Sequence, residues 1–514
     1  MLLISLPIFN VGMSVSLFWV SGVWLIDFLN DIVVEKDPWR KFRRFWSHKW
    51  AVLLTSILLL HAVGMIHTED VTYGMRDLRI KSPLFIIPFV LSSFPLISDR
   101  AHKILIGFFM AAVTFSAFTN LMVYWGWVDR ELTDIRLISK SFISRISHIR
   151  LSLMCALAIS ICGYQIRHRR KILIYLACAA INLYFIWVIE SITGFGVLIF
   201  ALVVYFITWS IKNCKHRLAK FSLLGSFAII AVGITFLVVS YNQYHETASQ
   251  LDLNNLPTHT TGGEAYDHNL GNSQIENGHY VWLFVAWDEL RVTWDTRSEI
   301  GLDKIDGRGQ PIYGTLIRYM TSLGLNKDAQ GVAALSDADV ALIESGVSSI
   351  LEGKRHGIRG RLDKIFLEID LYSNSGDPSG HSLTQRLEFW RAGIHTFKKN
   401  WAVGVGTGDI GITLDQSYHE INTKLQEGSR FRIHNQYFSF AVAFGIFGFL
   451  WIVWVLIYPI RKGYLANFIF FMFYVMALTS FLTEDTIESQ AGVGYFIYLL
   501  GALSIVRSPS ESSL

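Results

Sequence analysis

Charged and polar residues with catalytic potential gather beside apolar segments in this 514-residue chain. His434 and Asn435 open one apolar segment, and Glu190 and Ser191 lie between two others. Ionisable groups at a bilayer boundary beside a large loop are typical of a site for an amphiphilic substrate with a polar head in water. The other members of the group are Arg386, Arg391, Arg430, Arg432, Glu484, Asp485 and Glu488.

These residue types suit one kind of reaction. A neutral histidine can take a proton from an attacking hydroxyl. Arginines bind phosphate oxygens through a planar fork and keep their charge in a partly dry site. Together they fit attack by a sugar hydroxyl on a carbon whose leaving group is a lipid diphosphate, with the arginines stabilising the charge on the departing group.

Each residue also has a simpler interpretation. A single histidine at a helix end is more often an interfacial residue, and arginines near membrane ends usually contact water or lipid head groups. The acidic group Glu484 to Glu488 has the pattern of an exposed loop. Gly404, Gly406 and Gly408 do not follow a strand, which favours a flexible turn over a nucleotide site.

Composition indicates the setting of these residues. The chain is 52% hydrophobic and 17% charged, whereas soluble proteins carry about a quarter charged residues. Apolar blocks approach the roughly 20 residues that span a bilayer as a helix. We therefore expect an all-α polytopic membrane protein with about eleven spans (ten to twelve): Ile8–Leu29, Trp50–Ile66, Pro83–Ile97, Leu105–Trp125, Leu151–Ile166, Ile172–Ile189, Gly194–Ile211, Phe221–Tyr241, Asn435–Ile457, Leu465–Leu482 and Val493–Val506.

Basic residues in short loops mark the cytoplasmic side of a membrane protein. With these spans, five basic connections fall on one side, and the stretch Trp125–Arg150 on the other side reads as an interfacial amphipathic segment. The first thirty residues form either one span or a span plus a re-entrant piece. The basic connections contain Arg40, Lys41, Arg43, Arg44 and Lys49; Arg100 and Lys103; Arg167, Arg169, Arg170 and Lys171; Lys212, Lys215, Arg217 and Lys220; and Arg461 and Lys462.

The apolar pattern divides the chain into three parts. We expect an N-terminal transmembrane bundle (1–241), a large extracytoplasmic and mainly helical loop domain (242–433), and C-terminal transmembrane helices (434–514). The loop domain opens with a disordered-looking part, Thr247–Asn277. Its helical patterns are Tyr280–Arg297, Tyr313–Leu323, Asp337–Leu351 with Ser336 as N-cap, Arg359–Leu371 and Gln385–Asn400.

The cysteines predict neither disulfides nor a metal site. None of the four lies in the loop domain, and there is no C-x-x-C pair or Cys/His cluster. We therefore expect no metal and no cofactor, and nothing in the sequence points to a nucleic-acid partner.

The order of residues in the last third of the chain resembles the signature region of O-antigen ligases and the related polymerases. In that family a helix with an arginine leads to a glycine turn, and a His-Asn or His-Ser pair then begins a span. The segment FLTEDTIESQAGV, Phe481–Val493, also looks like proteins of this type. The matching residues are Arg386, Asn400, Gly404, Gly406, His434, Asn435 and Gly445.

The resemblance implies roles for several residues. His434 is implied as the base that activates the acceptor, and Arg386 as a contact of the diphosphate of an undecaprenyl-linked glycan donor. Asp485, with Glu484 as the near alternative, occupies the place of a functional acidic residue, with Asn435 beside it. The family implies a metal-independent, GT-C-like membrane glycosyltransferase of lipopolysaccharide or polysaccharide biosynthesis, in the inner membrane with its large loop periplasmic.

One feature departs from the family pattern. Family members have an arginine in a short outer turn of the type S-R-x-G, but here the turn reads Glu190-Ser191-Ile192-Thr193-Gly194. Another cation could replace it, and the candidates are Arg391, Arg432 and Lys81.

Several functions remain open at this point. A ligase would use a lipid A-core sugar as acceptor, a polymerase the next repeat unit, and a protein O-glycosyltransferase a serine or threonine. The single large loop before the histidine span favours the ligase. A transporter or flippase of lipid-linked sugars would place charges at mid-span and show paired halves. A receptor or scaffold would need no His/Arg site.

Overall fold

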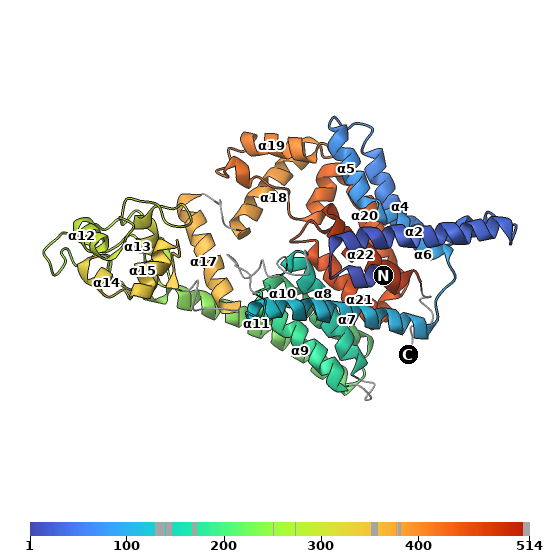
Figure 1. Cartoon of the computed structure of the whole chain (residues 1–514), viewed down its shortest axis with the longest axis horizontal. Coiled ribbons are helices and arrows are strands. Elements are labelled where there is room, and N and C mark those ends of the chain that lie inside the picture. Colours follow the sequence, from blue (N-terminus) through green and yellow to red (C-terminus); the bar gives the residue numbers. More distant parts are fainter. Residues whose placement is uncertain are drawn as a thin grey trace. The chain divides into compact units, whose positions relative to one another are not determined.

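The computed structural model describes residues 1–128, 139, 146–166, 172–249, 251–272, 274–350, 358–376, 378 and 382–506. In this part of the chain the regular structure is predominantly helical (Figure 1). The exception is a two-stranded antiparallel sheet of β1 (Ile275–Glu276) and β2 (His279–Tyr280). The predicted amphipathic segment Trp125–Arg150 and the basic connection at 167–171 lie largely or wholly outside the described residues.

Each predicted span coincides with one apolar helix. Among the described residues, five helices are long and apolar enough to cross a membrane, namely α2, α7, α10, α11 and α20. This confirms a multi-pass helical protein, while the count of eleven stays a prediction. The helices are α2 (Asn10–Val33), α4 (Lys49–Val63), α6 (Pro83–Ser93), α7 (Asp99–Tyr124), α8 (His148–Gln165), α9 (Ile172–Val188), α10 (Ile192–Lys212), α11 (Arg217–Ser249), α20 (Gln436–Arg461), α21 (Phe468–Ser480) and α22 (Gln490–Ser504).

Two of these elements clarify the span boundaries. The N-terminus forms a single turn, α1 (Leu2–Ser5), followed by the continuous 24-residue helix α2. Helix α6 has 11 residues, which at 1.5 Å per residue covers about 16 Å, well short of the roughly 30 Å of a hydrocarbon core. It packs against α3 (Arg40–Ser47), α4 and α22, so protein surrounds much of it.

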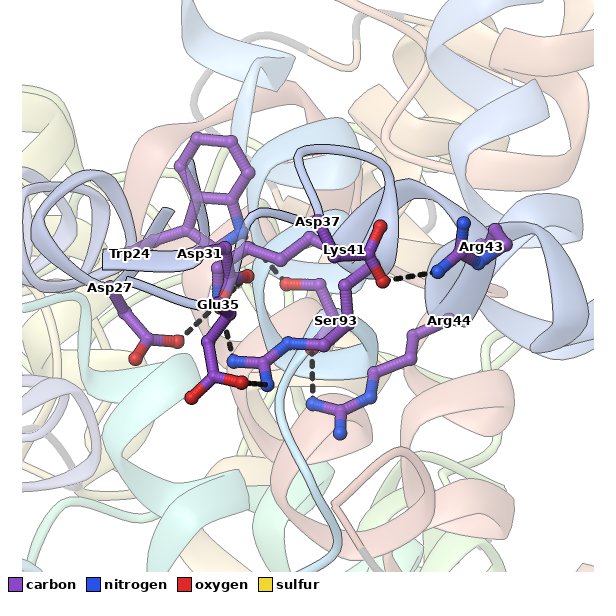
Figure 2. A network of polar contacts seen from close by, with 10 residues as sticks. Trp24, Asp27, Asp31, Glu35, Asp37, Lys41, Arg43, Arg44 and Ser93 are labelled. Carbon is purple, nitrogen blue, oxygen red and sulfur yellow. Dashed lines mark hydrogen bonds and ion pairs between the residues drawn. The ribbon is translucent and has the colours of Figure 1, made fainter. Parts of the chain in front are cut away.

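A buried ionic network joins α2 to α3 (Figure 2). Asp31 and Lys41 are both fully buried; Lys41 pairs with Asp27, and Arg40 pairs with Asp31. Trp24 and Arg44 both donate to Ser93 at the end of α6, at 2.8 and 3.3 Å. Charges at the end of an apolar helix are tolerated when opposite charges pair with them. The network therefore fixes the end of α2 against α3 and α6.

The chain forms two compact units. The first contains Met1–Ser226, Arg386–Thr423 and Glu427–Leu514, and the second contains Phe227–Gln385 and Lys424–Gln426. The second unit has its own apolar core, in which Trp294, Leu316, Ile317 and Met320 are fully buried. Among the described residues it contains α11 from Phe227 onward and the helices α12 (Trp287–Arg297), α13 (Ile312–Ser322), α14 (Ala329–Ala333), α15 (Asp337–Glu344) and α17 (Ile358–Ser375).

The second unit corrects two expectations and confirms a third. The helix expected over Tyr280–Arg297 begins only at Trp287, because the residues before it form β2 and turns. The stretch Thr247–Asn277 is not a disordered tract: α11 extends to Ser249, and Asp267 exchanges backbone hydrogen bonds with Val285 at 2.7 and 3.2 Å. Ser336 caps α15 as predicted, in a capping box with Asp339.

The glycine segment 401–409 is a tightly packed turn and not a flexible one. Gly404 has φ +76°, and a Cβ there would lie 2.4 Å from the backbone of Ala443. Helix α20 is broken at Gly445, which has φ +61°, and a Cβ there would lie 2.1 Å from Ala402 O. The break allows backbone hydrogen bonds between turn and helix: Val405 N–H to Val442 O, Gly406 N–H to Ala443 O, and Ile446 N–H to Trp401 O, at 3.0, 2.9 and 2.7 Å.

The same turn holds the corner between α4 and α5 (Val71–Lys81). The carboxylate of Asp409 accepts the backbone N–H groups of Glu69 and Asp70 at 2.9 to 3.1 Å, and Thr407 Oγ1 donates to His61 O at 2.6 Å. A carboxylate at a helix N-terminus satisfies donors that have no partner within the helix. The glycine turn thereby fixes α5 relative to α20.

Replacing Gly404 with alanine is expected to destabilise the first unit, because the new Cβ overlaps Ala443 and the backbone has positive φ. The cost should be about 1–3 kcal/mol or more. Gly411→Ala is the control, since Gly411 lies on α19 (Ile410–Glu420) with nothing within 4 Å of its Cβ position. Thermal unfolding in nanodiscs measures both variants, and equal melting temperatures would contradict the close packing.

The stability of the second unit should depend on Lys327. Its side chain is 2% exposed, and Nζ donates to Tyr280 O and Leu283 O at 3.0 and 3.1 Å. Burial lowers the pKa of Lys327 to about 7. Since the unfolded chain holds this proton up to a higher pH, stability should rise between pH 7 and 9 by at most about 1.4 kcal/mol per pH unit.

Lys327→Met is the matched comparison, because methionine is unbranched and carries no proton to lose. Hydrogen-exchange protection of α13 in the full-length protein reports the stability. We expect protection to rise with pH more steeply in the wild type than in Lys327→Met, and parallel pH profiles would contradict this role.

Candidate active site

His434 occupies a strained turn immediately before α20. Its φ is +51°, which is uncommon for a residue with a side chain. The backbone N–H of His434 donates to Asp485 Oδ2 at 2.9 Å, and Asp485 Oδ1 accepts from Ser439 Oγ at 2.8 Å. Asp485 therefore holds the main chain of His434 in place rather than its imidazole ring.

The imidazole of His434 keeps a ring nitrogen available. Nδ1 is buried and has no hydrogen-bond partner within the described part of the chain. The ring lies 5.6 Å, centroid to centroid, from Phe389 of α18 (Ser382–Lys399). Buried polar atoms in native proteins usually have a partner, so this nitrogen is a candidate contact for a substrate hydroxyl.

Arg386 lies beside the same turn. Its Nη2 donates to Glu484 Oε1 at 2.9 Å. Burial raises the pKa of Glu484, while the positive charges of Arg386, His434 when protonated, and Arg150 oppose the rise. The sequence-predicted residues His434, Arg386, Glu484 and Asp485 are thus brought together by α18, the turn before α20 and the segment before α22.

Asn435 has a structural task at this place. Its Oδ1 accepts the backbone N–H of Phe438 at 3.1 Å and caps α20, while Nδ2 donates to Leu482 O at 3.0 Å. Both ends of the amide are therefore engaged. We infer that Asn435 positions its neighbour His434 and does not itself bind a substrate.

A second ionic group adjoins the first and centres on Glu488. This carboxylate is 5% exposed and contacts Arg432 at 2.9 Å and Lys81 at 2.8 Å, while Gln436 donates to it at 3.1 Å. Lys81 also pairs with Asp77 at 2.6 Å. Burial alone would raise the pKa of Glu488, but Arg432 and Lys81 outweigh it and hold this pKa well below its ordinary value.

Arg432 retains some donor capacity. Its Nη2 is buried without a hydrogen-bond partner among the described residues, and its guanidinium lies 5.7 Å from the ring centroid of Tyr73. Burial acts to lower the pKa of Arg432, but the negative charge of Glu488 and its acidic neighbours outweighs burial and raises this pKa. Arg432 therefore stays charged at a side-chain exposure of 27%, a state in which a guanidinium can bind phosphate oxygens.

Arg391 lies differently from the other predicted arginines. It pairs with Glu388, three residues earlier on α18, at 3.3 Å, and its side chain is 59% exposed. Within the described residues its ion pair is thus on α18 itself and not with the acidic group at 484–488.

Sequence analysis missed the contribution of α5. Tyr73 and Asp77 come from this short polar helix, and only Lys81 of its residues was considered. The available signal was the spacing of Asp77 and Lys81, four residues apart on one helical face between two apolar segments. The described residues contain no cluster of three His, Cys, Asp or Glu side chains suited to a metal ion.

The chain is thus a multi-pass helical membrane protein with a cluster of histidine, arginine and carboxylate side chains at the ends of its helices. Comparison with protein families adds a match to the O-antigen ligase model over residues 340–453. The chain therefore carries the O-antigen ligase family signature, which is associated with glycosyltransferases of the ligase or polymerase type. No curated protein matches the chain in sequence.

The matched segment contains the histidine and arginine residues of the site but not its carboxylates. It includes Arg386, Arg432, His434 and the glycine turn, and it ends within α20. Lys81 and the acidic residues Glu484, Asp485 and Glu488 lie outside it and join the cluster through folding.

Glu488→Gln should destabilise the protein, because it leaves Lys81 and Arg432 without their shared carboxylate. Breaking a buried ion pair from one side costs about 3–5 kcal/mol. The control is Glu427→Gln, since Glu427 is exposed. Denaturant titration in nanodiscs compares the two variants with the wild type, and a Glu488→Gln protein as stable as the control would show that Glu488 is dispensable for folding.

Proposed function

We propose that this protein is a metal-independent, O-antigen ligase-like glycosyltransferase. It moves a glycan from an undecaprenyl-diphosphate donor to an extracytoplasmic acceptor, with a lipid A-core sugar as the first candidate. One observation carries the proposal: within the family-matched segment, His434 has a buried ring nitrogen with no hydrogen-bond partner among the described residues, and it lies beside the Arg386–Glu484 pair.

The proposed reaction is a single displacement. His434 accepts the proton of the acceptor hydroxyl, and the hydroxyl oxygen forms a bond to the anomeric carbon of the donor glycan. The bond between that carbon and the diphosphate oxygen breaks, and its electron pair leaves with undecaprenyl diphosphate. Arg386 and Arg432 stabilise the charge on the leaving group, and Asp485 keeps His434 in its strained conformation.

The proposal includes a location and an organisation. Basic residues in the short connections support an inner-membrane protein whose His434 end faces the periplasm. In this proposal the segment 242–433 lies on the periplasmic side, where a lipid-linked donor presents its sugar. Membrane lipids are then further partners of the protein.

The test is glycan transfer by the purified protein in liposomes with chelator present. We expect His434→Ala to lower the transfer rate about 100-fold or more, because general-base catalysis contributes 10²–10⁴. His419→Ala is the matched control, since His419 has a side chain that is 57% exposed. Offering a lipid A-core acceptor, a second repeat unit and an acceptor peptide distinguishes ligase, polymerase and protein glycosyltransferase.

Two outcomes would contradict the proposal. If folded His434→Ala transfers glycan as fast as the wild type, His434 is structural and the mechanism is wrong. If the wild type transfers to none of the acceptors but moves the donor across the bilayer, the protein is a transporter of lipid-linked sugars.

A further inference from the structure

Arg150 lies in the first turn of α8, against the start of α22. A Cβ at Gly492 would be 3.2 Å from Arg150 Nε, and also far too close to Thr486 O. Glycine at position 492 therefore leaves the space beside the Arg150 guanidinium. The acidic groups whose charges act on Arg150 are Glu484 and Asp485, the same carboxylates that contact Arg386 and His434.

The turn that lacks the arginine of the family pattern packs onto this same part of α8. Ser191 Oγ donates to Ser152 Oγ at 2.9 Å, and a Cβ at Gly194 would lie 2.9 Å from Ser152 Cβ. Ser152 is two residues after Arg150. Because residues two apart on a helix lie on different faces, Ser152 contacts this turn while Arg150 faces α22 and the acidic residues.

Arg150 also differs from the other cations of the cluster. Arg386 has an ion pair with Glu484, and Arg432 and Lys81 share Glu488, at 2.8 to 2.9 Å. For Arg150 the described residues provide no ion pair within 4.0 Å. An incoming anion can thus engage its guanidinium without breaking an existing pair, whereas drawing Lys81 away would leave Glu488 and Asp77 undercompensated.

We propose that Arg150 binds the diphosphate of the lipid-linked donor, and so supplies from α8 the positive charge that the turn at 190–194 lacks. This assignment rests on the proposed function. The planar guanidinium fork matches two phosphate oxygens at once, and Arg386 on α18 approaches the same carboxylates from another element. Arg150 is a better candidate for this task than Arg391, because Arg391 is exposed and already paired within α18.

The experiment measures two quantities for Arg150→Ala, Arg150→Lys and the wild type. The first is the KM for the glycan donor in the transfer assay. The second is the affinity of the protein in nanodiscs for undecaprenyl diphosphate and for undecaprenyl monophosphate. Arg79→Ala is the control, since Arg79 is an exposed arginine on α5.

We expect Arg150→Ala to raise the donor KM and weaken diphosphate-lipid binding about 10- to 100-fold, the usual effect of losing a charged hydrogen bond. The preference for diphosphate over monophosphate should shrink, which a merely structural role would not produce. Arg150→Lys should recover part of the affinity as a point charge without the fork, and Arg79→Ala should match the wild type.

Unchanged KM and affinity in Arg150→Ala would overturn the proposal, as would a loss of kcat alone. If Arg150→Ala does not fold, Arg150→Lys decides: several-fold weaker diphosphate-lipid binding supports the assignment, and wild-type binding overturns it. If the wild type transfers no glycan but Arg150→Ala still weakens diphosphate-lipid binding selectively, the proposed function fails while the binding site stands.

Discussion

Much of the first unit depends on one buried carboxylate shared by two cations. Glu488 lies in the short helical turn η5 (Thr486–Glu488), Lys81 ends α5, and Arg432 precedes α20. Three segments distant in sequence are therefore held at one point. Because Asp77 supplies a second negative charge to Lys81, the group of four is balanced, which is the condition under which charges can remain in a dry interior.

The ionic group requires close backbone packing around it. Glycines 404 and 445 let the turn at 401–409 touch α20 through main-chain atoms, and Asp409 then binds the start of α5. If this turn were looser, the far end of α5 and its Lys81 would not be fixed opposite Glu488. The glycine pattern in the sequence thus has a structural explanation, and it connects the family-matched segment to the start of a helix 339 residues earlier in the chain.

The sequence predicted what depends on hydropathy and on topology. Every apolar block formed a helix, and placing charged residues at one membrane face correctly grouped His434 with Arg386 and the acids at 484–485. It did not predict the contacts of Tyr73 and Asp77 or the position of Arg150 near Glu484 and Asp485, because these depend on which helices pack together over long sequence separations. The β1–β2 hairpin and the ordered segment after α11 were missed for a related reason. Their polar composition is typical of disordered segments, and their order depends on packing against a core such as that around Trp294.

The carboxylate beside His434 acts on the main chain of the histidine and not on its imidazole ring. When a carboxylate contacts an imidazole nitrogen, it fixes the tautomer and orientation of the ring. Asp485 instead binds the backbone N–H of His434 and the hydroxyl of Ser439, so it stabilises the strained main chain. The ring is then oriented by packing against Phe389, and Nδ1 has no protein partner among the described residues. In the proposed mechanism the acceptor hydroxyl itself completes the hydrogen bonding of the base, which couples acceptor binding to the formation of the active site.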